Sequence, residues 1–408
     1  MKKAVPALFA AALAACVPPP RTAHPVAPPA PPPSVMLVEP EAWPAIADDL
    51  DAESLARAAE KSQAYLSAQG DKLLEFGTLS LGTRLLSETL AELVRARRET
   101  PDATALAARL KDGFELYRVR GATAGGGAFY SSYYQPILEA SRTRTAEFKY
   151  PLYRKPADLV EVDLSAFDPK WKSERIYGRV SSEGTFVPYF NRSDIDIRAQ
   201  LAGKDLEIAW LKDSFERLDI HIEGSGLLRF SDGTMVMARF AATNGRPYSS
   251  VGLAVIGSGA MTRAELTHET LKAYLAEHPE GEGWLLARNP RYTFFELVDL
   301  PADGEPNGTI GQALTAGRSI AVDASVVPLG AAAWVSVPLP QADAEGRLLA
   351  RGTVKRFMLA QDTGGAIKGP GRVDLYMGHG ADAQTTARRV WDAGELYILV
   401  KKRPARTR

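Results

Sequence analysis

A mainly β-sheet fold that begins with helices is predicted by three observations on this 408-residue chain. Apolar residues recur at helical spacing over residues 51–69 and 79–98. Later segments are short alternating or β-branched runs separated by Gly, Asp-Gly and Asn-Gly turns. One further helix is expected, because Thr262 and Glu265 form a capping-box pattern before an amphipathic stretch that ends near His278.

The expected strands fall into two groups along the chain. The middle of the chain has alternating runs at residues 159–167, 175–180, 185–190, 206–210, 218–224 and 227–240. Asp232-Gly233 within the last run predicts a hairpin turn. The end of the chain has runs at residues 318–330, 332–339, 354–362, 372–378 and 395–402.

Composition describes an ordinary globular protein. With 45% apolar residues the chain can bury a sizeable core, and its length favours about two domains. Forty-nine basic residues balance forty-nine acidic ones, so no overall field attracts nucleic acid or an anionic membrane surface. The basic last eight residues are interpreted as a solvated tail. We therefore expect no nucleic-acid partner.

The N-terminus predicts export and lipidation. Two lysines and an apolar run over residues 4–15 precede Cys16, the only cysteine; the run is too short for a permanent membrane helix but fits a secretory signal. The segment LAAC ending at Cys16 resembles a bacterial lipoprotein box, and an ordinary signal peptide with an incidental cysteine is the alternative. Residues 17–44 are proline-rich and predict a semi-rigid spacer. We expect residues 1–16 to be a lipoprotein signal peptide with its lipobox cysteine, cleaved just before Cys16. The lipidated Cys16 then becomes the first residue of the mature chain and anchors an outer-membrane lipoprotein facing the periplasm.

Metal, nucleophile and phosphate motifs are weak. The five histidines are scattered, and His221 with Glu223 would share one strand face without further ligands, so we predict no metal. Ser225 lies in GSG rather than in a G-x-S-x-G elbow and is interpreted as a polar turn or groove residue. Lys368 lies in a glycine-rich loop that lacks the order of a phosphate-binding loop. No cofactor is expected.

Three aspartates stand out because each lies beside a predicted strand and near glycines: Asp323, Asp362 and Asp374. Glycine admits positive φ and close approach of another backbone or a ligand, so the loop between the last two is expected to have a defined shape. In one cleft, like charges and poor solvation would raise the pKa of one carboxyl above about 3.9. The three aspartates thus predict a general acid at neutral pH. The loop glycines are Gly364, Gly365, Gly369 and Gly371.

A second interpretation starts from Asp362-Thr363-Gly364, which matches the D-T-G of aspartic proteases. Those enzymes need two such aspartates that share a proton, and this chain has one copy. A homodimeric aspartic protease-like hydrolase using Asp362 therefore remains an alternative.

The segments AVDASVVPLG and AQDTGGAIKGPGRVDLYMG resemble the three-aspartate signature of the membrane-bound lytic murein transglycosylase A family. The likeness extends upstream through GRVSSEGTFVPYFNRSDI, EIAWLKDSFERLDIHIEGSGLLRFSDGT and NPRYTFFEL. It implies a double-psi β-barrel from residues 45–137 plus 300–408, with a second β-domain inserted at 138–299 and a glycan groove between them. It also implies that no metal or cofactor takes part.

The resemblance implies that Asp374 is the catalytic acid/base and that Asp323 and Asp362 shape the cleft and tune it. The reaction would cleave the β-1,4 bond between N-acetylmuramic acid (MurNAc) and N-acetylglucosamine (GlcNAc) in peptidoglycan and form 1,6-anhydro-MurNAc. A hydrolase needs a second carboxylate. Here the C6 hydroxyl is a tethered nucleophile, so one carboxyl can serve both proton transfers.

Substrate contacts are expected along the implied groove. The aromatics Tyr133, Tyr134 and Tyr189 either stack on sugar faces or belong to the core. Glu223 stands where the family usually has glutamine, and the remaining expected contacts are Ser225, Gly364, Gly365 and Lys368. We expect a monomer whose partners are glycan strands and, through the lipid anchor only, the membrane. A non-catalytic peptidoglycan-binding module is the other alternative.

Overall fold

The computed structural model describes residues 34–121, 123, 125–171, 174–301 and 304–403. The predicted signal peptide, Cys16, most of the spacer and the last residues of the basic tail lie outside the described residues. From residue 33 onward the chain forms one compact unit. Among the helices that the structure describes, none has the length and apolar character to cross a bilayer.

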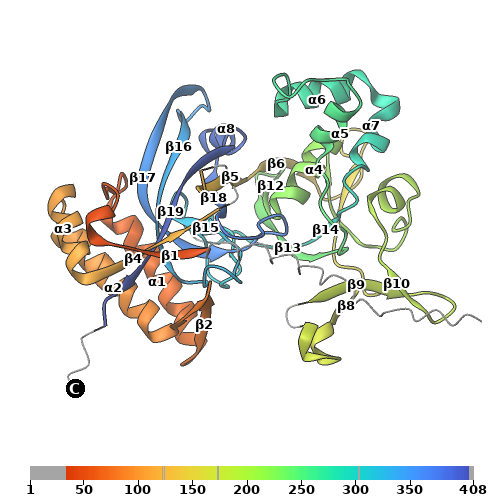
Figure 1. The fold of residues 1–408 in the computed structure, drawn as a ribbon. Helices are drawn as coiled ribbons and strands as arrows, with labels where there is room; N and C mark the ends of the chain where they lie inside the picture. The colour runs from red at the N-terminus through yellow and green to blue at the C-terminus, as the bar shows by residue number, and fades with distance from the viewer. Residues whose placement is uncertain (1–33, 122, 124, 172–173, 302–303, 404–408) are drawn as a thin grey trace, which may run out of the picture. The chain divides into compact units, whose positions relative to one another are not determined.

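The central element is a closed β-barrel (Figure 1). Eight strands pair in the order β1, β4, β19, β16, β17, β15, β18 and β5, and β5 pairs again with β19, so the last six form a closed ring. Strands β15–β17 and β18–β5 run parallel, whereas the other neighbours in the ring are antiparallel. The bounds are β1 (Val35–Val38), β4 (Phe114–Val119), β5 (Ala128–Gln135), β15 (Ser319–Ala321), β16 (Ala332–Ala342), β17 (Leu348–Asp362), β18 (Arg372–His379) and β19 (Asp392–Lys401).

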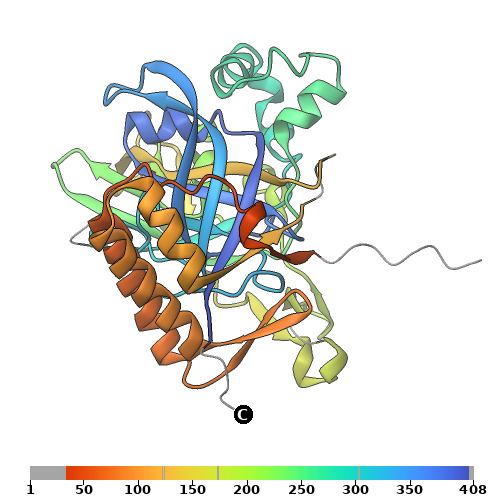
Figure 2. The same ribbon diagram turned by 60° about the vertical axis from the view of Figure 1, so that its left-hand side comes forward.

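Three N-terminal helices, α1 (Ala52–Ala68), α2 (Thr83–Glu99) and α3 (Ala103–Gly113), pack on this barrel (Figure 2). Helices α1 and α2 confirm the helical periodicity, but α2 starts later than predicted. Residues 79–82 form strand β3 (Leu79–Gly82), which pairs with β2 (Leu73–Phe76). Helix α3 was not predicted, although the side chain of Asp102 caps its N-terminus.

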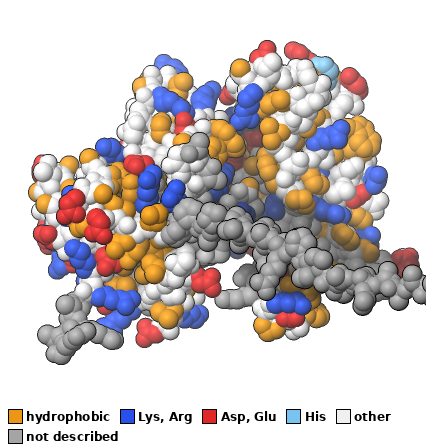
Figure 3. All heavy atoms as spheres, viewed as in Figure 1, with side chains coloured by type: hydrophobic (Ala, Val, Ile, Leu, Met, Phe, Trp, Pro, Cys, Tyr) orange, Lys and Arg blue, Asp and Glu red, His pale blue; other side chains and the backbone are white. Residues whose placement is uncertain are grey.

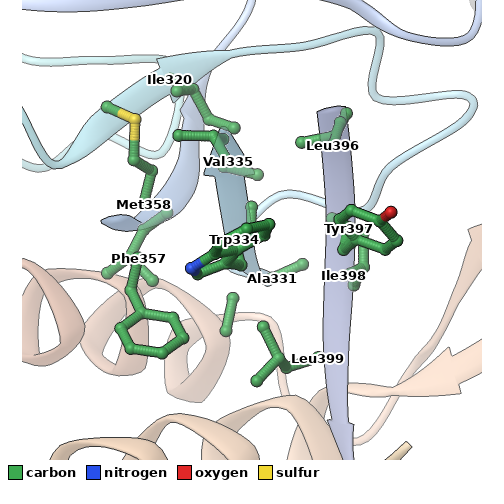
Figure 4. Packing of buried hydrophobic residues seen from close by; sticks show 14 of the residues in the cluster. Ile320, Ala331, Trp334, Val335, Phe357, Met358, Leu396, Tyr397, Ile398 and Leu399 are labelled. Atoms are coloured by element: carbon green, nitrogen blue, oxygen red, sulfur yellow. The ribbon is translucent and has the colours of Figure 1, made fainter. Parts of the chain in front are cut away.

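The barrel core is a large apolar cluster in which Trp334 of β16 packs with Phe357 of β17 and Leu399 of β19 (Figure 4). The Nε1–H of Trp334 donates to the carbonyl of Ala47 at 2.8 Å, so its one polar atom is satisfied. Basic and acidic side chains are interspersed over the face seen in Figure 3, as the balanced composition predicts.

The middle of the chain forms two further sheets. One has six strands in the order β14, β13, β12, β6, β11 and β7, and the other has β10, β9 and β8. The bounds are β6 (Ile137–Ser141), β7 (Tyr150–Tyr153), β8 (Val160–Asp163), β9 (Arg175–Val180), β10 (Phe186–Pro188), β11 (Glu207–Leu211), β12 (Gly226–Phe230), β13 (Met235–Thr243) and β14 (Thr293–Asp299). Gly233, with a φ of +83°, makes the predicted turn between β12 and β13.

Five more helices and four short helical turns complete the described chain. They are α4 (Ser214–Glu223), α5 (Val251–Gly257), α6 (His268–Glu277), α7 (Pro279–Leu286) and α8 (Ala381–Ala387), with η1 (Pro40–Ala42), η2 (Leu164–Ala166), η3 (Pro169–Trp171) and η4 (Ser193–Ile197). The prediction of one further helix is therefore wrong, because the described chain has five. Thr262 and Glu265 do hydrogen-bond, but the capping box that starts α6 is formed by Thr267 and Thr270.

The predicted strand at residues 218–224 is wrong, because this segment belongs to helix α4. The side chain of Asp213 caps the N-terminus of the helix, and Gly224, with a φ of +82°, ends it. The apolar alternation in LDIHIE is short, and a short run fits a strand or one face of a helix equally well. Consecutive helical residues turn by about 100°, so His221 and Glu223 point to different sides rather than to one strand face.

Candidate active site

The barrel pairs two of the three predicted aspartates with the same residue. Ala321 on β15 pairs with Asp374 on β18 and with Asp362 at the end of β17. Ser131 on β5 pairs with Asp374 from the other side. Because paired residues point to one face of a sheet and neighbouring strands lie about 4.8 Å apart, both carboxylates lie on the same face with their Cα atoms roughly 10 Å apart.

Asp374 is a partly buried carboxyl with an unusual proton affinity. Its Oδ1 accepts a hydrogen bond from Ser131 Oγ at 2.6 Å, and Ser131 Oγ also receives Arg372 Nη2 at 2.7 Å. Burial raises the pKa of Asp374 from 3.8 to about 6, the Ser131 hydrogen bond and the Arg372 charge oppose the rise, and the charge of Asp362 adds to it. Both protonation states of Asp374 are therefore populated near neutral pH, as a general acid/base requires.

Asp362 is fixed by donors on both carboxylate oxygens. Its Oδ1 accepts the backbone N–H and the hydroxyl of Thr309 at 2.9 and 2.8 Å, and also the Thr363 N–H at 2.9 Å. Its Oδ2 accepts the hydroxyl of Tyr133 at 2.8 Å. Burial, followed by the charge of Asp362, raises the pKa of Tyr133 well above its usual value. These contacts hold the Asp362 carboxylate in place where its charge acts on Asp374.

Asp323 faces the glycine-rich loop. Its Oδ1 accepts the N–H and the hydroxyl of Ser325 at 3.0 and 2.7 Å, and its Oδ2 accepts the N–H of Gly369 at 2.7 Å. Burial would raise the pKa of Asp323, but the hydrogen bonds from Ser325 and Gly369 outweigh it and lower the pKa. The charges that act on Asp374 come from Arg372 and Asp362. Asp323 thus fastens the loop.

The loop glycines serve different purposes. Gly369 and Gly371 have φ values of +83° and +66°, which confirms the need for glycine at these positions. A Cβ on Gly371 would lie 2.6 Å from the Cα of Gly121, so two backbones are in contact there. A Cβ on Gly364 would meet the side chain of Ile367, and one on Gly365 would lie 3.3 Å from Arg291 Nη1. Lys368 is exposed.

Glu223 brings a further carboxyl toward Asp374. It is partly buried at the C-terminus of α4, and its Oε2 accepts the backbone N–H of Tyr134 at 3.1 Å. Burial raises the pKa of Glu223 well above its usual value, and the charges of Asp219 and Asp374 raise it further against the effects of Tyr134 and Arg388. Its surroundings therefore favour the neutral form of the Glu223 carboxyl. Ser225, after the end of α4, is partly buried.

His221 is part of the core packing, not of a polar strand face. Its ring is buried at the edge of Tyr292, and its Nδ1 lies 3.0 Å from Arg192 Nη1. Burial and the two nearby guanidinium groups of Arg192 and Arg217 lower the pKa of His221 well below its usual value. The neutral ring thus packs beside two arginines.

The three tyrosines occupy different environments. Tyr133 bonds Asp362, and its ring centroid lies 5.1 Å from that of Tyr376. Tyr134 is buried against α8, and its hydroxyl accepts Arg388 Nη2 at 2.8 Å. Tyr189 is fully buried and donates to Asp158 at 2.9 Å. The burial of Tyr134 and Tyr189 favours the core alternative for both.

Sequence reasoning missed the groups that surround the two carboxylates. Arg372 had a signal, because residues two apart on a strand share a face and Arg372 precedes Asp374 by two. Ser131 and Thr309 are distant in sequence, and only strand pairing and loop packing bring them to Asp374 and Asp362.

Comparisons with known proteins show which proteins this chain resembles. The family model described as MltA specific insert domain matches residues 129–296, and the model described as 3D domain matches residues 318–400. Membrane-bound lytic murein transglycosylase A of Escherichia coli K12 is 28% identical over 290 residues, which cover 70% of this chain and 69% of that protein. The Vibrio cholerae protein of the same name is 26% identical over 290 residues, with the same coverage of both chains.

Solved structures are similar over most of their length. A membrane-bound lytic murein transglycosylase from Agrobacterium tumefaciens has a TM-score of 0.70 and 27% identity, covering 90% of this chain and 98% of that one. MltA from Neisseria gonorrhoeae has a TM-score of 0.65 and 26% identity, covering 90% and 94%. E. coli MltA with bound chitohexaose, at 22% identity, a TM-score of 0.66 and coverage of 91% and 95%, shares the fold.

Proposed function

Because the chain belongs to the membrane-bound lytic murein transglycosylase A family, we propose that it is a peptidoglycan lytic transglycosylase. It cleaves the β-1,4 bond between MurNAc and GlcNAc and leaves 1,6-anhydro-MurNAc. The observation that carries this proposal is Asp374, a partly buried carboxyl with a pKa of about 6 beside the fixed Asp362 carboxylate.

In the proposed mechanism Asp374 makes two proton transfers. Protonated Asp374 gives its proton to the glycosidic oxygen, so the bond from MurNAc C1 to that oxygen breaks and GlcNAc leaves with a free hydroxyl. The resulting carboxylate then takes the proton of the MurNAc C6 hydroxyl as O6 attacks C1. A new C1–O6 bond closes the anhydro ring, and Asp374 is again protonated. A carboxyl with a pKa near the working pH suits both steps.

The neighbours of Asp374 have distinct proposed roles. The Asp362 charge raises the pKa of Asp374 and lies on the same barrel face, where it would stabilise positive charge that develops at C1. Asp323 keeps the glycine-rich loop in shape through Gly369. Protonated Glu223 can donate a hydrogen bond to a sugar hydroxyl or acetamide oxygen, as a glutamine would.

We further propose that the catalytic barrel comprises residues 45–137 plus 300–408, extended by strand β1 through its pairing with β4, and that the inserted domain comprises residues 138–299. In support, barrel strand β5 ends at Gln135 and the next barrel strand, β15, begins at Ser319. All six strands of the six-stranded sheet, from β6 to β14, come from the sequence between these two. The glycan path would run past Asp374 and Glu223, with Tyr133, Ser225, Gly364, Gly365 and Lys368 as further contacts. Anchoring through Cys16 at the outer membrane, and a monomeric state, remain predictions.

The test is mass spectrometry of the soluble products released from purified sacculi by a protein that begins at Val35. The expected products are anhydromuropeptides, and they should vanish with Asp374→Asn. Reducing-end sugars would contradict the proposal and indicate a hydrolase with a second catalytic carboxylate. Cleaved stem peptides would favour the protease that uses Asp362, and sacculus binding without products would favour the non-catalytic module.

A further inference from the structure

Two arginines near the candidate site lack the acidic partners that several other arginines of the middle of the chain have. Within the described residues, the guanidinium groups of Arg179 on β9 and Arg291 before β14 form no ion pair and donate no hydrogen bond, although both residues are partly buried. Burial lowers the pKa of Arg291. A cation removed from water without an anion is costly, so these two groups favour an anion from outside the chain.

Five other arginines of the middle of the chain show the contrast. Each has a carboxylate partner: Arg175 with Glu161, Arg192 and Arg217 with Asp196, Arg198 with Asp194, and Arg239 with Glu296. Among the acidic residues, Glu183 is one whose pKa the Arg179 charge lowers. That effect is the smallest of the several that act on Glu183, and the hydrogen bonds from Ser182 and Ser181 lower its pKa more. Glu183 is fully exposed and accepts the Ser182 hydroxyl, so it leaves Arg179 without a partner.

These guanidinium groups form a path that starts at the catalytic loop. Arg291 Nη1 lies 3.3 Å from where a Cβ on Gly365 would be, three residues after Asp362. The Arg291 charge also acts on Tyr177 of β9, and Arg179 follows Tyr177 by two residues on the same strand face. A Cβ on Gly245 would touch Tyr177 at 2.5 Å, and Arg246 comes next in the chain. We call Arg291, Arg179 and Arg246 the arginine strip.

The strip ends in a pocket of about 710 Å³. The guanidinium carbon of Arg179 lies 4.4 Å from the centroid of the Phe190 ring, and its Nε is buried without a partner. Arg246 is oriented by donating Nε and Nη2 to the Tyr189 carbonyl. The pocket also offers the neutral polar groups of Ser181, Thr185 and Gln200, together with Glu183 and the paired Asp194 and Arg198. Planar guanidinium groups held in this way match the geometry of a carboxylate.

We propose that the arginine strip binds the carboxylates of the peptide stem that is attached to the muramoyl sugar. This proposal rests on the proposed function, because a peptidoglycan strand presents its negative charges chiefly on these stems. The glycan would lie at Asp374, and the stem would extend past Gly365 along Arg291 toward Arg179 and the pocket. The inserted domain would then select strands that still carry peptides.

Calorimetric binding of a soluble, unlinked stem tetrapeptide to Asp374→Asn tests the proposal without relying on turnover. We expect binding that weakens with added salt and falls about tenfold when Arg179→Gln or Arg291→Gln is added, as loss of a charge-assisted hydrogen bond predicts. Amidation of the peptide carboxylates should reduce binding similarly. Arg175→Gln is the matched control on β9, because its charge is already paired with Glu161. Equal binding by all variants would overturn the proposal.

A second measurement compares kcat/KM on stem-bearing and peptide-free glycan strands. Arg179→Gln and Arg291→Gln should lower the preference for stem-bearing strands about tenfold, while Arg175→Gln keeps it. An equal loss on both strands would mean that the arginines support the fold only, and this would overturn stem recognition. If the protein releases no product from either strand, the proposed function fails while the tetrapeptide binding result still stands.

Discussion

Asp374 and Asp323 look alike in the sequence, since each ends up in or beside a strand near glycines, yet their surroundings shift their pKa values in opposite directions. Asp374 accepts one hydrogen bond from a hydroxyl, at Oδ1, and is partly buried on strand β18. Asp323 receives two backbone N–H groups and a hydroxyl in a turn. Burial raises the pKa of both carboxyls. At Asp323 the three donors and the Lys368 charge outweigh burial, whereas at Asp374 burial and the Asp362 charge outweigh the Ser131 hydrogen bond and the Arg372 charge.

The opposite pKa shifts suit the two aspartates to different roles, Asp374 to proton transfer and Asp323 to positioning the loop. A carboxyl with few donors is a poor anion and a usable acid, whereas a carboxylate with several donors is a stable anion and a good clamp. Asp362 combines a fixed position with an electrostatic effect on Asp374. It is anchored like Asp323, but its charge acts on Asp374.

The largest expected effect comes from Asp374→Asn compared with Asp323→Asn. Asp374→Asn should lower the release of anhydromuropeptides about a thousandfold, because the amide can neither give nor take the proton. Asp323→Asn should cost about tenfold at most, because it loosens one loop contact. Product release by both purified variants, with folding checked by circular dichroism, measures the ratio. Equal losses would contradict the assignment of proton transfer to Asp374 and of loop positioning to Asp323.

Asp362→Asn should change the pH profile as well as the rate. Its charge raises the pKa of Asp374, so its removal should move the alkaline limb of kcat/KM, expected near pH 6, to lower pH. Ser131→Ala is the matched opposite, because the Ser131 hydrogen bond lowers the pKa of Asp374 and its loss should move the limb to higher pH. If both variants move the limb in one direction, Asp374 is not the group that titrates.

Asp374→Asn should also change stability in a pH-dependent way. The folded protein holds the Asp374 proton more tightly than the unfolded chain, so wild-type stability falls as pH rises from about 4 through about 6. The amide removes this loss. After allowance for partial exposure, we expect the variant to gain about 2 kcal/mol in the free energy of unfolding at pH 8 and nothing at pH 3.5. Urea unfolding at both pH values measures this, and a gain of equal size at pH 3.5 would contradict it.

Glu223→Gln is expected to have the smallest effect. The raised pKa of Glu223 favours the neutral carboxyl, and a glutamine can likewise donate and accept hydrogen bonds. Activity at pH 6 should change by less than about threefold, whereas Glu223→Ala should lose about tenfold. Activity that collapses in Glu223→Gln would instead assign Glu223 a proton-transfer role.

Local pattern was sufficient for much of the fold and failed at identifiable places. The alternating run of residues 175–180 coincides with β9, and α1 matches its helical periodicity within one residue at each end. The run at 218–224 predicts a strand because it alternates, but it is short. The N-cap at Asp213 and the packing of Phe215 and Leu218 make it a helix. Local preference in such a run is weak enough for tertiary packing to decide.

The sequence by itself determined most of the strands, the glycines at 369 and 371, where the backbone has positive φ, and the three aspartates that lie near them. Only the tertiary structure decided their roles. A pKa depends on burial, donors and charges within a few ångströms, and these come from segments as distant as Ser131 and Asp374, which β5–β18 pairing joins. The unpaired state of Arg179 and Arg291 is likewise a property of the packed chain, because no local pattern shows which carboxylates other arginines have taken.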